Sequence, residues 1–71
     1  MSQYLIVLER TRTGYGVYVP DLPGCVAIGR TNAEAERNAR EAIGLHLDGL
    51  RAVGRPSPKP ETKGTYVTVA A

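Results

Sequence analysis

The chain has 71 residues, enough for one small domain over residues 1–71 but not for two, because a chain of this length buries only about 60% of its surface. Hydrophobic residues make up 42% of the chain and charged residues 23%, proportions that exclude a collagen-like or wholly disordered protein. The net charge of +2 is spread along the chain, so no basic patch for nucleic acid stands out.

The cysteine content and the apolar runs restrict the compartment and the kinds of bound group that we expect. Cys25 is the single cysteine, which excludes a disulfide within the chain and a metal site built from several cysteines. No apolar run approaches the roughly 18 residues of a membrane span, and the first residues lack the features of a signal peptide. We therefore expect a cytoplasmic protein with no membrane partner, no metal and no cofactor.

The first part of the chain predicts a hairpin. Residues 4–8 are apolar and rich in β-branched side chains, and their number suits a strand. The polar residues 11–14 end in Gly14, which tolerates a positive φ. They lead into a second strand-like segment at residues 15–19. The two strands are therefore expected to pair in antiparallel fashion.

A second reversal follows the hairpin. Pro20 ends the second strand because it has no N–H for the sheet ladder, and Asp21 is interpreted as a turn former. Pro23 and Gly24 suit the two central positions of a type II turn. A third strand at residues 25–28 then completes an antiparallel meander.

The next segment has clear signals for a helix. Thr31 with Glu34 three residues later fits a capping box, although Asn32 is an alternative N-cap. Gly54 stands where a left-handed residue ends a helix, and Pro56 prevents its continuation. A helix of about 22 residues is roughly 33 Å long, so its last turns should extend past strands of roughly 20 Å. Its small and apolar side chains fall on one face, at positions 35, 39, 42, 43, 46, 47, 50 and 53.

The end of the chain predicts a fourth strand. Residues 55–63 form a proline-rich connection that neither a helix nor a central strand tolerates. Residues 65–69 are β-branched apart from Tyr66, as is typical of a strand. A right-handed crossover through the helix would place this strand parallel to the first one. The predicted fold is α+β in the order β-β-β-α-β, with a four-stranded mixed sheet and one helix on one face.

One face of this predicted sheet has no cover. The strand at residues 4–8 carries apolar side chains of both parities, so one set points away from the helix. An exposed apolar face in a small chain without a disulfide or metal predicts association, either as a homodimer or higher assembly or with another protein. The candidate contact residues are Leu5, Val7, Tyr18, Leu47 and Leu50.

The reactive side chains do not favour an enzyme. His46 lies in the apolar stripe of the predicted helix, where a packed or interface imidazole is favoured over a general base. Cys25 has no basic neighbour in sequence to activate it as a nucleophile, so a small apolar role is favoured. We therefore expect no catalytic residue.

The alternative to a protein-binding role is a stand-alone dimeric sheet module that binds RNA or a small ligand. Tyrosines on strands stack unpaired bases in sheet-based RNA-binding proteins, and arginines at strand ends contact phosphates. The candidate RNA-contact residues are Arg10, Arg12 and Tyr15. No motif as specific as the RNP sequences accompanies them, so ordinary sheet packing is the favoured interpretation of the tyrosines.

Three stretches of the chain together resemble the HicB antitoxin family. They read GYGVYVPDLPGCV at residues 14–26, GRTNAEA at residues 29–35 and NAREAI at residues 38–43. The resemblance extends over residues 4–53. It implies a partial ribonuclease H-like fold that forms dimers or higher assemblies.

The resemblance also implies a function. Members of this family typically bind and block HicA, a small toxin that cleaves messenger RNA, and many carry a further C-terminal domain that binds DNA. After residue 69 only Ala70 and Ala71 remain, so we expect no DNA binding. Ribonuclease H chemistry needs a cluster of metal-binding carboxylates, of which the first strand offers only Glu9. The expected function is steric, non-catalytic inhibition of a HicA-type toxin.

Overall fold

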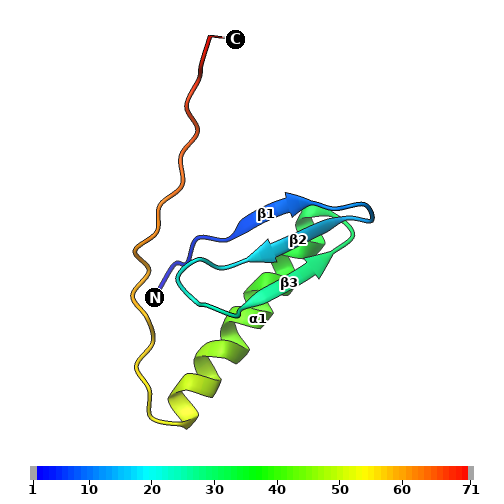
Figure 1. Ribbon diagram of the computed structural model, residues 1–71. Helices are drawn as coiled ribbons and strands as arrows, with labels where there is room; N and C mark the ends of the chain where they lie inside the picture. Colours follow the sequence, from blue (N-terminus) through cyan, green and yellow to red (C-terminus); the bar gives the residue numbers. More distant parts are fainter. Residues whose placement is uncertain (1, 71) are drawn as a thin grey trace.

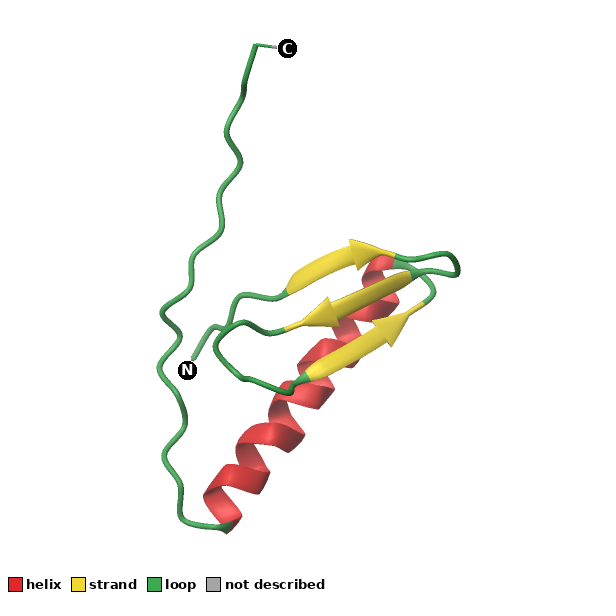
Figure 2. Cartoon of the chain, viewed as in Figure 1, coloured by secondary structure: helices red, strands yellow, loops and turns green. Residues whose placement is uncertain are grey.

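The computed structural model describes residues 2–70, which form three strands followed by one helix (Figure 1). The strands are β1 (Val7–Arg10), β2 (Tyr15–Tyr18) and β3 (Val26–Gly29), and the helix is α1 (Asn32–Ala52). The sheet is antiparallel in the order β1-β2-β3, and α1 covers one of its faces (Figure 2). The α+β class, the meander and the single helix are therefore as the sequence predicts.

The register of the strands decides which side chains face the helix. Val17 in the central strand lies opposite Leu8 of β1 and Ala27 of β3. This row packs toward α1, and Val17 is buried against Ala35 of the helix. Because side chains alternate along a strand, the neighbouring row of the sheet points away from the helix.

The turn between β2 and β3 has the predicted geometry. Gly24 has a φ of 85°, as the second central residue of a type II turn requires. The N–H of Cys25 donates to the carbonyl of Leu22 over 3.0 Å and closes this turn. Leu22 itself is completely buried, so the turn is part of the core.

Gly14 differs from its predicted role. Gly24 and Gly54 are the glycines with positive φ in residues 2–70, and Gly14 is not among them. What Gly14 provides is space, because a Cβ atom there would lie 2.8 Å from the Cα of Arg30. The residue is needed for the close approach of the β1–β2 turn to the end of β3.

Both ends of α1 have the predicted caps. The side chain of Thr31, not Asn32, accepts a hydrogen bond from the N–H of Glu34 over 3.1 Å. The carboxylate of Glu34 accepts from the N–H of Arg30 over 3.0 Å. At the other end Gly54 has a φ of 73°, and the N–H of Arg55 donates to the carbonyl of Leu50 over 2.9 Å. These bonds satisfy main-chain groups that a helix leaves free at its ends.

The core between the sheet and α1 is small. Its buried side chains form two clusters, one of Val17, Ala35 and Ala39 and one of Val19, Leu22 and Cys25. Farther along the predicted apolar stripe of the helix, Ala42, Ile43 and Leu47 pack against the second cluster. The last turns of α1 continue beyond the sheet, as its length predicts (Figure 1).

The predicted fourth strand is wrong for this chain. Residues 65–69 are extended, yet they pair with no strand in the part of the chain that the structure describes, and the sheet has three strands rather than four. Tyr66 is fully exposed. The segment runs away from the body of the molecule (Figure 1).

Contacts made just before this segment explain its course. The hydroxyl of Tyr4 donates to the carbonyl of Pro58, and the carboxylate of Asp21 accepts from the N–H groups of Glu61 and Thr62. These bonds hold the connection beside the sheet end from which β1 starts. β-branched side chains favour an extended backbone, but strand pairing also requires that the chain reach a free sheet edge in register.

Candidate functional site

The face of the sheet opposite α1 is open and carries several large apolar side chains. Tyr18 lies between Val7 of β1 and Val26 of β3, and these three side chains form one row across the sheet. Ile28 follows on the same face of β3 by strand alternation. Tyr18, Val26 and Ile28 are 44%, 66% and 77% exposed. Large apolar side chains gathered on one surface mark a site of association rather than of chemistry. We call Val7, Tyr18, Val26 and Ile28 the open face.

The five predicted contact residues lie in different surroundings. Val7 and Tyr18 belong to the open face, and Leu5 is half-buried just before β1. Leu47 packs against the core, and Leu50 is half-buried near the end of α1. The structure thus brings two of the five together on the open face, and their contact with a partner remains a prediction.

Val26 and Ile28 are exposed positions that the sequence analysis did not single out. The signal for them was present in the alternation of the third strand. Once Cys25 and Ala27 are assigned to the helix side, Val26 between them and Ile28 after Ala27 must point outward. Register supplies the remaining information, because it places Val26 directly beside Tyr18.

The candidate RNA-contact residues do not share this surface. The guanidinium carbon of Arg10 lies 5.9 Å from the centre of the Tyr15 ring, an arrangement suited to a cation–π contact. Tyr15 packs against the core cluster on the helix side, whereas Tyr18 faces the other way. Arg12 is exposed in the turn after β1. No common stacking surface of tyrosines follows from these positions.

The two residues weighed for catalysis also lie apart from the open face. Cys25 is buried with Val19 and Leu22, and burial raises the pKa of its thiol, so the reactive thiolate is disfavoured. His46 is half-buried on α1.

Residues 2–70 contain no group of three or more His, Cys, Asp or Glu side chains that could hold a metal ion. In the same range, no helix is long and apolar enough to cross a membrane.

Asp21 connects the turn before β3 to the segment after α1. Its Oδ2 accepts from the N–H groups of Glu61 and Thr62 over 3.0 and 2.9 Å, and its Oδ1 accepts from the Thr62 hydroxyl over 2.7 Å. The bonds from Thr62 are the main cause of the lowered pKa of this carboxyl, because they stabilise its charged form. We call this arrangement the Asp21 clamp.

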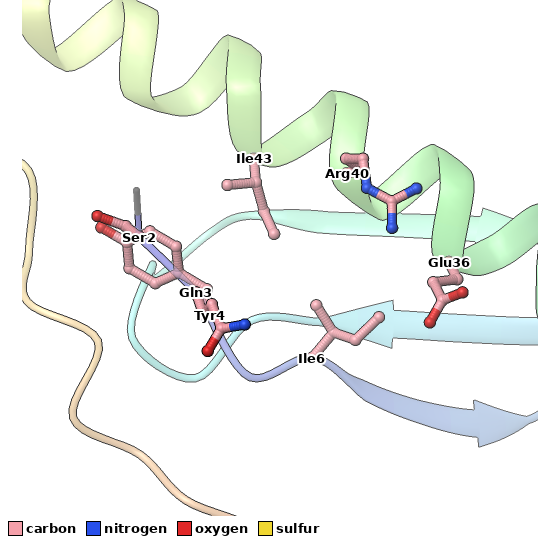
Figure 3. A pocket seen from close by; sticks show the side chains of 7 residues that line it. All are labelled: Ser2, Gln3, Tyr4, Ile6, Glu36, Arg40 and Ile43. Carbon is pink, nitrogen blue, oxygen red and sulfur yellow. The ribbon is translucent and has the colours of Figure 1, made fainter.

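A hollow lies between α1 and the chain that enters β1 (Figure 3). Its volume is about 440 Å³. Ile6 and Ile43 give it an apolar floor, and Glu36 and Arg40 of the helix stand at its rim (Figure 3). On the strand side it is lined by the chain just before β1, and among residues 2–70 no strand pairs with the outer side of β1.

Comparison with known proteins identifies the family. Residues 4–69 match the model of the HicB_like antitoxin of bacterial toxin-antitoxin systems. The chain belongs to this antitoxin family. Relatives agree with the assignment: Antitoxin HicB 2 of Photorhabdus laumondii is 34% identical over 97% of this chain. An uncharacterized 14.9 kDa protein of Haemophilus phage HP1 is 41% identical over 93% of it.

The structure of this HicB-like chain resembles a solved structure of the family. It matches a chain of the HicA3 and HicB3 toxin-antitoxin complex with a TM-score of 0.73 and 37% identity, over 84% of this chain and 70% of that chain. The HicB-like chain spans 57% of the length of the phage relative and 50% of the Photorhabdus antitoxin. The likeness therefore concerns the domain that these proteins share.

Proposed function

We propose that this HicB-like chain binds a HicA-type toxin and inhibits it by covering the toxin surface that meets messenger RNA. The family assignment supports an antitoxin role, and the similar chain of known structure occurs in a HicA3 and HicB3 complex. Steric inhibition needs a surface for association and no reactive group. Because such a toxin acts on messenger RNA, the proposal places the chain in the cytoplasm.

The open face carries this proposal. Protein interfaces derive most of their binding energy from a few large side chains that become fully desolvated. Tyr18 offers an aromatic ring with a polar hydroxyl, and Ile28 and Val26 offer apolar area beside it. Tyr18 lies between Val7 and Val26 on the two neighbouring strands, so these side chains present one continuous row to a partner.

The test is a charge placed on the open face. Ile28→Asp leaves the core untouched, since this side chain is 77% exposed, but it would bury a carboxylate in an apolar interface. We expect the affinity for a HicA-type toxin that the unsubstituted chain binds to fall about 100-fold, which corresponds to about 2.7 kcal/mol. Isothermal titration calorimetry measures the affinity, and rescue of growth on co-expression measures inhibition.

Leu45→Asp is the matched control. Leu45 is 74% exposed on α1, so the same substitution adds the same charge on a surface outside the open face. It should leave toxin affinity within twofold of the unsubstituted chain. Equal losses for both variants, or no loss for Ile28→Asp, would contradict the assignment of the open face as the toxin-binding surface.

A further inference from the structure

We propose that residues 65–69 form a strand that pairs with β1 of a second copy of this chain, so that two copies exchange their C-terminal strands. The donor segment, the course of the connection before it and the free edge that would accept it are three separate observations. None of them depends on toxin binding.

The donor segment has the properties of a strand without a sheet. Residues 65–69 are extended, and on them Tyr66 is fully exposed while Val67 and Val69 are 79% and 72% exposed. Such a segment presents unpaired N–H and C=O groups and apolar side chains to water, which is the typical template for pairing with another chain. A single strand is not stable by itself, so its extended form predicts a neighbouring strand.

The connection directs this segment away from its own sheet. The Asp21 clamp holds Glu61 and Thr62, and a Cβ atom built on Gly64 would lie 3.5 Å from both methyl groups of Leu5. The chain is thus in contact with the residues before β1 as far as Gly64. Beyond this point it continues outward rather than turning along β1 (Figure 1).

Of the two sheet edges, that of β1 is the better acceptor. At the other edge the side-chain amide of Asn38 donates to the main-chain carbonyl of Ile28 over 2.8 Å, so the helix already occupies an acceptor of β3. Among the residues that the structure describes, β1 has no neighbouring strand on its outer side, and the hollow lined by Ile6 and Ile43 lies beside the chain that enters β1. A strand added there would extend the sheet and cover the hollow with one of its faces.

The side-chain alternation of the donor suits that position. Val67 and Val69 share one face of the segment and would lie over the hollow. Tyr66 and Thr68 share the other and would extend the open face of the sheet. A second copy is the fitting partner because each copy offers the same donor and the same edge, which gives a closed two-fold exchange with no free edge of β1 left.

The first experiment measures mass in solution with the full-length chain alone. Val67→Pro removes a main-chain donor and fixes φ, so a strand centred there cannot pair fully. Sedimentation equilibrium should give twice the 7.6 kDa mass of one chain for the unsubstituted protein and the mass of one chain for Val67→Pro. Ser57→Pro places the same residue between Pro56 and Pro58 in the exposed connection and should keep the dimer mass.

The second experiment shows which chain receives the strand. One sample of the chain carries a spin label at Thr68→Cys in a Cys25→Ala background and has natural isotope abundance. It is mixed with a second sample that is ¹⁵N-labelled and carries no spin label. Selective broadening of the β1 amides in the ¹⁵N-labelled chains supports the exchange. A single-chain mass for the unsubstituted protein, or no broadening of the β1 amides in the ¹⁵N-labelled chains, would overturn it.

Discussion

At the scale of single residues, Asp21 has two structural roles. It lies in the turn between β2 and β3, and its carboxylate binds Thr62, which is 41 residues away along the chain. The first role follows from turn preferences that local sequence expresses. The second depends on how the segment after α1 passes the sheet, and no local pattern at Asp21 encodes that contact.

The Asp21 clamp should release its segment in acid. Its folded-state pKa lies below the ordinary value of about 3.9, so the contacts are fully present above that value and are lost as the pH falls through the lower, folded-state pKa. The amide resonances of Glu61 and Thr62, followed by NMR from pH 6 to pH 2, should move with this titration. Asp21→Ala should give the released amide positions already at pH 6, whereas Asp48→Ala on α1 should not. Unchanged amide positions in Asp21→Ala would contradict the clamp.

Two glycines should respond in opposite directions to the same substitution. A Cβ atom on Gly29 would lie 2.6 Å from the Cα of Ala35, so the helix and β3 must separate in Gly29→Ala. We expect a loss of about 1–3 kcal/mol in the free energy of unfolding, as for other overpacked sites. Gly44 lies on the exposed side of α1 with no atom within 4 Å of such a Cβ, and Gly44→Ala should gain about 1 kcal/mol through helix propensity. Urea denaturation measures both, and a neutral Gly29→Ala would show that β3 and α1 are not closely packed.

At the scale of elements, α1 is the part of the fold most fully encoded in its own sequence. Thr31 and Gly54 mark its two ends, and the buried Ala35 and Ala39 lie on the predicted apolar face. Each of these signals acts within one or two helical turns. Residues 65–69 show the opposite situation, because their composition indicates a strand but does not say which edge they join.

The N-cap of α1 provides a direct test at this scale. Thr31→Ala removes the acceptor for the N–H of Glu34 and should lower the free energy of unfolding by about 1 kcal/mol. Asn32→Ala, one position later, should change it by less than about half that amount, because Asn32 is the first helical residue and not the cap. Thermal unfolding followed by circular dichroism distinguishes the two. Equal effects would show that Asn32 shares the capping role.

At the scale of the whole molecule, the chain has two incomplete surfaces that serve different proposed partners. The open face around Tyr18 is assigned to the toxin, and the edge of β1 is assigned to a second copy. Ile28→Asp should therefore weaken toxin binding while keeping the dimer mass, and Val67→Pro should change the mass through the edge of the sheet. The two proposals can fail independently, because each is read from a different measurement on a different surface.

Local sequence was enough to predict an antiparallel meander of three strands, the type II turn at Pro23 and Gly24, the bounds of α1 and the family. It placed the first strand at residues 4–8, whereas β1 lies at Val7–Arg10. These features depend on hydrogen bonds and side-chain periodicity between residues close in the chain, which local sequence specifies. The folded chain was needed to show that residues 65–69 do not join the sheet, that Val26 and Ile28 lie with Tyr18 on the open face, and that Asp21 holds Thr62. Those outcomes depend on register and on contacts between distant segments, where small differences in packing select one arrangement among several that the local sequence allows.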